Sequence, residues 1–141
     1  MIVYAESSAV LALLLGEPGA EGAGEALRDA ERVVASVLTG IECARAIRRH
    51  RAAGAIDLRD ELALLRLLSE VEQGWDVVGV SRAVADRAAA RFPVEPVRTL
   101  DALHVATAAV LQERIGQIVM LSRDDRVRTN AAALGLDLLP A

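Results

Sequence analysis

Short apolar runs alternate with longer amphipathic segments along the chain, and this alternation constrains the fold more than any other feature. The apolar runs at 2–4, 32–35, 77–80, 118–121 and 136–139 predict short strands. The segments at 9–15, 21–30, 36–53, 58–73, 81–92, 100–113 and 122–134 have the apolar spacing or the capping residues of helices. The predicted capping residues are Ser7 or Ser8, Ser36, Ser81 and Thr99. This order predicts an α/β fold with a central parallel sheet of four or five strands and helices on both faces.

The length and composition fit one domain. The chain has 141 residues, 53% of them hydrophobic, and no linker or repeat interrupts it. A chain of this size supports one core, so we expect a single domain over residues 1–141. The first residues lack the features of a signal peptide, and the apolar runs are far shorter than the ~20 residues that span a bilayer. We therefore expect a cytoplasmic protein.

The basic residues and the single cysteine exclude several functional classes. All 16 basic residues are arginine, which excludes the P-loop, protein kinases and Schiff-base enzymes because each needs a lysine amine. Cys43 alone cannot form a disulfide within the chain or a cysteine cluster for zinc. Three aromatic residues are too few for a platform on which nucleic-acid bases stack.

Four acidic residues, Glu6, Glu42, Asp101 and Asp124, stand close to the predicted carboxyl ends of strands, where parallel sheets bind ligands. Each acid has a structural alternative, because an acid in the first turn of a helix stabilises the helix dipole and Glu42 can pair with Arg45 in solvent. Four converging carboxylates would repel one another, and a hard cation such as Mg²⁺ or Mn²⁺ removes that repulsion. The set therefore predicts a metal site.

Four segments of the chain carry these acids. They are Tyr4-Ala5-Glu6-Ser7-Ser8-Ala9-Val10-Leu11, Ile41-Glu42-Cys43-Ala44-Arg45-Ala46, Val97-Arg98-Thr99-Leu100-Asp101-Ala102-Leu103-His104-Val105-Ala106 and Ser122-Arg123-Asp124. In this order and spacing they resemble the PIN-domain ribonucleases and, within that family, the VapC-type toxins of VapBC toxin–antitoxin modules. The third segment is the most specific, and the resemblance runs nearly from end to end.

The resemblance implies a PIN-like, Rossmann-like three-layer sandwich and a Mg²⁺- or Mn²⁺-dependent endoribonuclease that is the toxin of a type II toxin–antitoxin system. It also implies an RNA substrate, a cognate VapB-like antitoxin and a homodimer. By position, it assigns the metal-binding and catalytic roles to Glu6, Glu42, Asp101 and Asp124, and a supporting role to the hydroxyl groups of Ser8 and Ser122.

One residue departs from the family pattern. The family usually has Asp at the position of Glu6, whose carboxylate lies one methylene further from the backbone. Because metal sites are sensitive to ligand position, we expect weaker or shifted cation binding than an Asp would give. The alternative function is a catalytically weak PIN-fold protein that acts mainly by binding RNA or an antitoxin.

His104 follows Asp101 by three residues on the same predicted helix. It is a candidate ligand or general acid, but we favour a structural or supporting role beside the site, because a metal-dependent mechanism needs no histidine base.

Arginines near the acids are candidates for RNA contacts. Those we consider are Arg45, Arg48, Arg49, Arg98 and Arg123, which can attract the phosphates on either side of the cleaved bond. The alternatives for the first three are a solvated helix face or contacts with antitoxin acids. The apolar residues of 58–73 and 11–15 offer a surface for a dimer or an antitoxin helix, although we expect core packing for most of them.

Overall fold

Five short strands form one parallel sheet in the order β3-β2-β1-β4-β5. The protein is described here by a computed structural model that covers residues 1–141. The strands are β1 (Ile2–Ala5), β2 (Arg32–Ser36), β3 (Asp76–Val78), β4 (Ile118–Leu121) and β5 (Asp137–Leu139). The predicted α/β class and parallel sheet are confirmed. β3 ends two residues earlier than its apolar run predicted, because Gly79 and Val80 already lie in the loop that follows.

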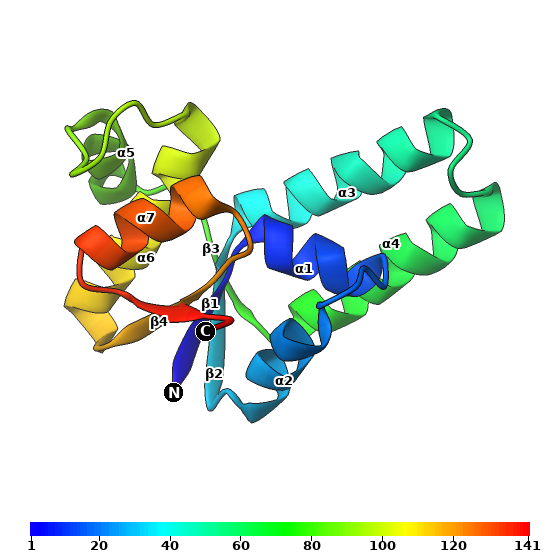
Figure 1. Cartoon of the computed structure of the whole chain (residues 1–141), viewed down its shortest axis with the longest axis horizontal. Coiled ribbons are helices and arrows are strands. Elements are labelled where there is room, and N and C mark those ends of the chain that lie inside the picture. Colours follow the sequence, from blue (N-terminus) through cyan, green and yellow to red (C-terminus); the bar gives the residue numbers. More distant parts are fainter.

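Helices fill every connection between the strands. They are α1 (Ser7–Leu14), α2 (Glu21–Asp29), α3 (Val37–Ala52), α4 (Leu58–Gln73), α5 (Arg82–Ala89), α6 (Thr99–Ile115) and α7 (Asp125–Ala133). In Figure 1, α3 and α4 form a long hairpin that projects away from the sheet. None of the helices is long and apolar enough to cross a membrane.

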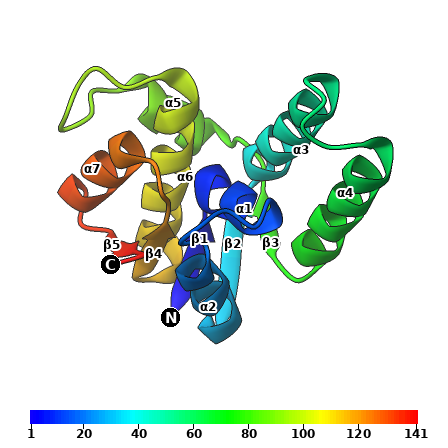
Figure 2. The ribbon, with the colours of Figure 1, turned by 45° about the vertical axis from the view of Figure 1, so that its right-hand side comes forward.

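Side chains that alternate along the strands build one large hydrophobic cluster on one face of the sheet and two smaller clusters on the other. Tyr4 and Met120 pack on the face covered by α5, α6 and α7. Val3 and Leu121 pack on the opposite face, against α2 and the start of α1. Figure 2 shows these two groups of helices on either side of the strands. The fold is therefore the three-layer sandwich that the resemblance implied.

The central strand β1 lies between β2 and β4. From β1 the chain first builds the sheet toward β3 at one edge and then returns to build it toward β5 at the other edge. Ala5 at the end of β1 is paired in register with Leu121 at the end of β4. Glu6 and Ser122 consequently leave the sheet side by side. Ligands of open parallel sheets bind at such a switch point, beyond the carboxyl ends of the strands.

The helices α1 and α6 begin with other residues than the predicted caps, and the structure identifies the cap of α7. The predictions of Ser7 or Ser8 as the cap of α1 and of Thr99 as the cap of α6 are wrong. The cap of α1 is Glu6, whose carboxylate accepts the backbone N–H of Ser8 at 3.1 Å. Arg98 precedes α6 without a side-chain capping bond, and Asp124 caps α7 through the N–H groups of Arg126 and Val127. The expected caps at Ser36 and Ser81 are confirmed.

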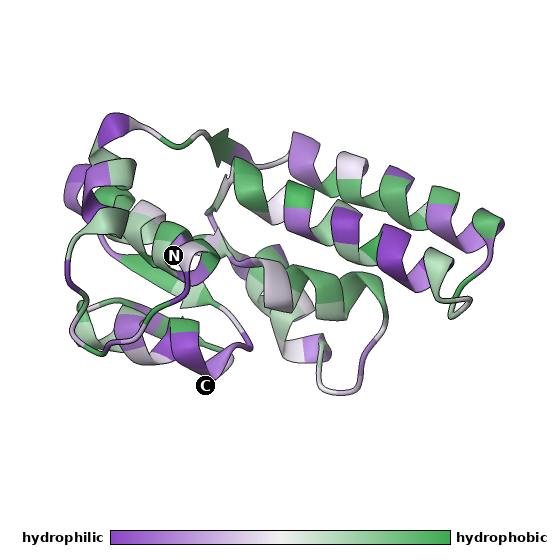
Figure 3. Cartoon of the chain, turned by 90° about the horizontal axis from the view of Figure 1, so that it is seen from above, coloured by the Kyte–Doolittle hydropathy of each residue, from purple (hydrophilic) through white to green (hydrophobic).

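The expectation of core packing along α4 is wrong for much of the helix. Leu58, Leu62 and Leu67 are exposed, with 54%, 56% and 43% of their surface open to solvent, and Leu68 is the leucine of α4 that is fully buried. Because the hairpin projects from the sheet, only part of α4 has a neighbour to pack against. Figure 3 shows hydrophobic and hydrophilic segments alternating along both α3 and α4.

Candidate metal centre

The four predicted acids line one cleft of about 180 Å³ at the carboxyl ends of β1, β2 and β4. Its polar lining consists of Glu6, Ser7, Ser8, Glu42, Arg49, Arg98, Asp101 and Asp124. A larger, mostly apolar cleft of about 290 Å³ lies between the end of β3 and α6, but no acid lines it. The carboxylates therefore gather at the place that the fold predicts for a ligand.

Glu6 is the most buried acid of the cleft, with 4% of its surface exposed, and Asp101 is also buried, with 8% exposed. Its Oε2 atom accepts hydrogen bonds from the backbone N–H of Ser8, from the Ser8 hydroxyl and from the Ser122 hydroxyl at 2.7 Å. Its Oε1 atom has no donor in the protein. Burial raises the pKa of Glu6, although the Ser8 and Ser122 hydrogen bonds offset part of that effect.

Glu42 extends from α3 and is held through one of its two oxygens. Its Oε1 atom accepts the Ser7 hydroxyl at 2.9 Å and a hydrogen bond from Nε2 of His104. Burial alone would raise the pKa of Glu42, but the interactions with His104, Ser7 and Arg49 together outweigh it, so the pKa lies below its usual range. The group is therefore a carboxylate at neutral pH, with its Oε2 atom free of protein donors.

Asp101 and Asp124 line the side of the cleft at the starts of α6 and α7, which forms its rim, and Arg98 lies between them. The Nε atom of Arg98 donates to Oδ2 of Asp101 at 3.0 Å, and its terminal nitrogen lies 3.7 Å from Oδ2 of Asp124. Oδ1 of Asp124 accepts the two N–H groups at the start of α7. The capping role considered for Asp124 is thus present, and it leaves the second oxygen facing the cleft.

The donor set suits a hard divalent cation, although no three His, Cys, Asp or Glu side chains converge closely enough to hold an ion directly. All four acids offer oxygen atoms, which Mg²⁺ and Mn²⁺ prefer. Mg²⁺ also keeps several water molecules and is held by one or two carboxylates in most proteins. The chemistry of these side chains therefore suits a divalent ion that would keep part of its water.

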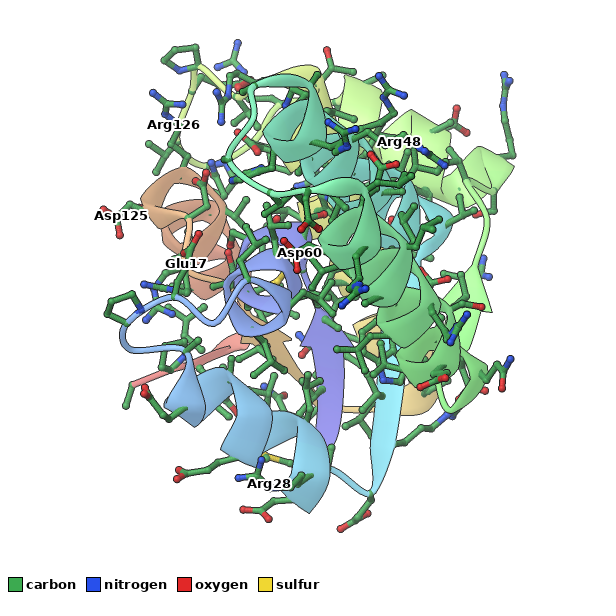
Figure 4. All side chains as sticks on the ribbon, turned by 90° about the vertical axis from the view of Figure 1, so that its right-hand side faces the viewer. Glu17, Arg28, Arg48, Asp60, Asp125 and Arg126 are labelled. Carbon is green, nitrogen blue, oxygen red and sulfur yellow. The ribbon has the colours of Figure 1, made fainter.

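The candidate arginines fall into two groups. Arg49 and Arg98 line the cleft, whereas Arg45, Arg48 and Arg123 do not. Arg48 lies 3.7 Å from Glu61 on α4, and Arg123 pairs with Glu17 in the loop after α1 at 3.3 Å. Arg48 and Glu17 are labelled in Figure 4. The structure thus places two of the five candidate arginines beside the acids.

Two residues in contact with Glu42 are buried and polar, and sequence reasoning assigned a role to only one of them. His104 is 1% exposed, so its predicted structural place beside the site agrees with its position. Ser7 contacts both Glu42 and His104, yet sequence reasoning noted it only as a helix cap. Cys43 is also buried, and burial raises the pKa of its thiol to about 12, so it stays a protonated, small core residue as expected.

The raised pKa of Glu6 predicts a change in stability with pH. A carboxyl whose pKa rises on folding destabilises the folded protein above that pKa and has no effect below the pKa of the unfolded chain. We expect Glu6→Gln, measured without metal at neutral pH, to raise the melting temperature by about 3 °C. The difference from wild type should shrink as the pH falls into the usual range of glutamate, because Glu6 then becomes neutral. The exposed Glu25→Gln is the control, and equal melting temperatures for Glu6→Gln and wild type at all pH values would contradict the prediction.

The sequence matches a family model and curated relatives over nearly its whole length. Residues 3–133 match the PIN domain. The chain is 32% identical to ribonuclease VapC46 of Mycobacterium tuberculosis, over 97% of this chain and 95% of the relative. It is 30% identical to ribonuclease VapC35 of the same species, over 96% and 93% of the two chains.

Solved structures agree on the fold. FitAB bound to the IR36 DNA fragment contains a chain with a TM-score of 0.67 and 15% identity, over 99% of this chain and 94% of that one. PAE2754 from Pyrobaculum aerophilum gives a TM-score of 0.60 at 19% identity, over 98% and 83%. The match of residues 3–133 to the PIN domain and the 32% identity to a VapC ribonuclease show that the chain belongs to the PIN-domain family, and within it to the VapC-type proteins.

Proposed function

We propose that this chain is a metal-dependent endoribonuclease and the toxin of a type II toxin–antitoxin system. The observation that carries the proposal is the gathering of Glu6, Glu42, Asp101 and Asp124 around one cleft, from four separate segments of the chain. The relatives that it matches end to end are named as ribonucleases, which supports the same activity. We assign the reaction to the cytoplasm, where the proposed RNA substrate is found.

Each acid has a defined part in the proposed site. Glu6 and Glu42 each use one oxygen for hydrogen bonds within the protein, which leaves Oε1 of Glu6 and Oε2 of Glu42 for a cation. Asp101 and Asp124 supply oxygens from the rim. A bound Mg²⁺ or Mn²⁺ ion would supply positive charge to the phosphate and lower the pKa of the attacking water.

The arginines of the cleft balance the acids and orient the substrate. A phosphate approaching four carboxylates is repelled, and fixed positive charge nearby reduces that repulsion. Arg49 is exposed on α3 and its charge acts on Glu42, while Arg98 spans the rim acids. Because a guanidinium stays charged at every physiological pH and matches phosphate in geometry, both residues suit contacts with the RNA backbone.

The exposed apolar side of α4 supports a protein partner. Leu58 and Leu62 lie with Arg59 and Arg66 along one open groove at the start of α4. Leucines flanked by arginines suit an amphipathic segment that carries acids, and we assign this partner to the antitoxin. The structural neighbour FitAB supports a protein partner for chains of this fold. The homodimer stays a prediction.

Removal of one rim carboxylate tests the proposed reaction. Asp101→Asn keeps the size of the side chain and removes its charge, so we expect weaker Mn²⁺ binding and RNA cleavage reduced about 100-fold. Cleavage of labelled RNA with Mn²⁺ should stop in EDTA and return with excess Mn²⁺. Asp125→Asn is the matched control, because Asp125 is exposed at the start of α7 outside the cleft (Figure 4).

Cleavage that persists in EDTA or in Asp101→Asn would contradict the proposal. If the wild-type protein binds Mn²⁺ and RNA but does not cleave, the weak-nuclease alternative replaces it.

The two groups of arginines predict different effects on RNA binding. We expect Arg49→Ala to weaken RNA binding and to reduce the slope of log affinity against log salt concentration by about one. Arg48→Ala should change both much less, because Arg48 is paired with Glu61 on α4. Fluorescence anisotropy in EDTA keeps the RNA intact, and equal effects of the two variants would contradict this division.

A partner that covers α4 should also control the activity. We expect the product of a short reading frame beside the gene to co-purify with this chain and to suppress cleavage. Leu62→Gln should weaken that complex while free Leu62→Gln cleaves RNA as the wild type does, since Leu62 lies outside the acid cleft. A complex of unchanged affinity would place the partner elsewhere.

A further inference from the structure

A chain of hydrogen bonds runs from the core of the protein to the acid cleft. It begins at the phenol of Tyr4, on the central strand, which is completely buried. The Tyr4 oxygen lies 2.7 Å from Nδ1 of His104, and the two rings meet edge to face with centroids 5.9 Å apart. On its other side, Nε2 of His104 contacts Glu42 and Ser7.

The burial of Tyr4 sets the direction of the first hydrogen bond. At neutral pH a tyrosine phenol carries its proton, and the Tyr4 hydroxyl is completely buried. A buried O–H group needs an acceptor, and an unprotonated Nδ1 of His104 supplies one at 2.7 Å. The hydroxyl therefore donates to Nδ1.

The tautomer of His104 follows from this direction. A neutral imidazole carries one proton, so a ring that accepts at Nδ1 carries it at Nε2. Nε2 faces Oε1 of Glu42 and the Ser7 hydroxyl oxygen, which lies at 3.1 Å. The Ser7 hydroxyl in turn donates to the same Oε1 atom at 2.9 Å. Two donors therefore hold one oxygen of Glu42, and its other oxygen stays available to the cleft.

We propose that Tyr4 is a positioning residue of the acid cleft. By donating to Nδ1, it holds His104 as the Nε2–H tautomer, and His104 with Ser7 orients Glu42 toward a bound cation. This role rests on the proposed metal-dependent function and extends it to a residue that touches neither cation nor substrate. A phenylalanine would fill the same space in the core, so the hydroxyl group itself carries the effect.

The first experiment reads the tautomer directly by ¹⁵N NMR of the imidazole rings, in the full-length protein without metal. The chain has two histidines, and His50 serves as an internal reference because its Nδ1 lies 2.8 Å from the carbonyl oxygen of Ala46, to which it donates. We expect His104 to show an unprotonated Nδ1 and a protonated Nε2 at neutral pH. His50, in contrast, should show a protonated Nδ1. A protonated Nδ1 in His104 would overturn the proposal.

The second experiment measures the consequence for the cleft. We expect Tyr4→Phe to shift the Nδ1 resonance of His104 and to weaken Mn²⁺ binding about tenfold by calorimetry. Ile118→Val is the matched control, because Ile118 is fully buried in the same core and its substitution disturbs packing without removing a hydrogen bond. His104→Gln should retain more Mn²⁺ affinity than His104→Leu, since the glutamine amide still offers a donor to Glu42.

The outcomes separate this role from the function on which it rests. Tyr4→Phe that binds Mn²⁺ as tightly as Ile118→Val would overturn the role of Tyr4 and leave the metal site intact. Wild-type protein that binds no Mn²⁺ would overturn both.

Discussion

The carboxylate of Glu6 is the group on which the arrangement of the site depends. Its Oε2 atom accepts three hydrogen bonds, and these connect the end of β1 to the first turn of α1 and to Ser122 beyond β4. A charge buried to this degree is stable only when its hydrogen bonds are satisfied. The same bonds that offset its burial therefore fix where α1 begins and hold it beside the end of β4, and they determine which oxygen faces the cleft.

Structural and functional roles coincide in these acids. Asp124 caps α7 with one oxygen and faces Arg98 with the other, and Glu6 caps α1 while it lines the cleft. A capping bond orients a carboxylate at little entropic cost, because the helix itself holds the side chain. The two readings of such an acid, as a helix cap and as a ligand, are therefore compatible. Arg98 adds a fixed positive charge that reduces repulsion between the rim acids.

Much of the fold could be predicted from the sequence, since apolar runs and caps such as Ser36 and Ser81 report local structure. The four acids could be placed together because three of them follow a strand end or begin a helix, and Glu42 lies in the second turn of the helix after β2. The parts that could not be predicted depend on side-chain direction. Ser7 is the clearest case, since its sequence position suits a helix cap, while its hydroxyl bonds with Glu42 across 35 residues. Exposure along α4 was missed for another reason, because a leucine pattern does not show that the hairpin leaves the sheet.

The contacts that build the cleft join distant parts of the chain. Ser122 reaches Glu6 across 116 residues, and Tyr4 reaches His104 across 100. Contacts of such high sequence separation form slowly, since the entropy of closing a large loop must be overcome first. During synthesis, the residues of β1 and α3 leave the ribosome long before β4 exists. The nascent chain therefore cannot present the complete acid cleft, and the proposed nuclease activity belongs to the finished molecule alone.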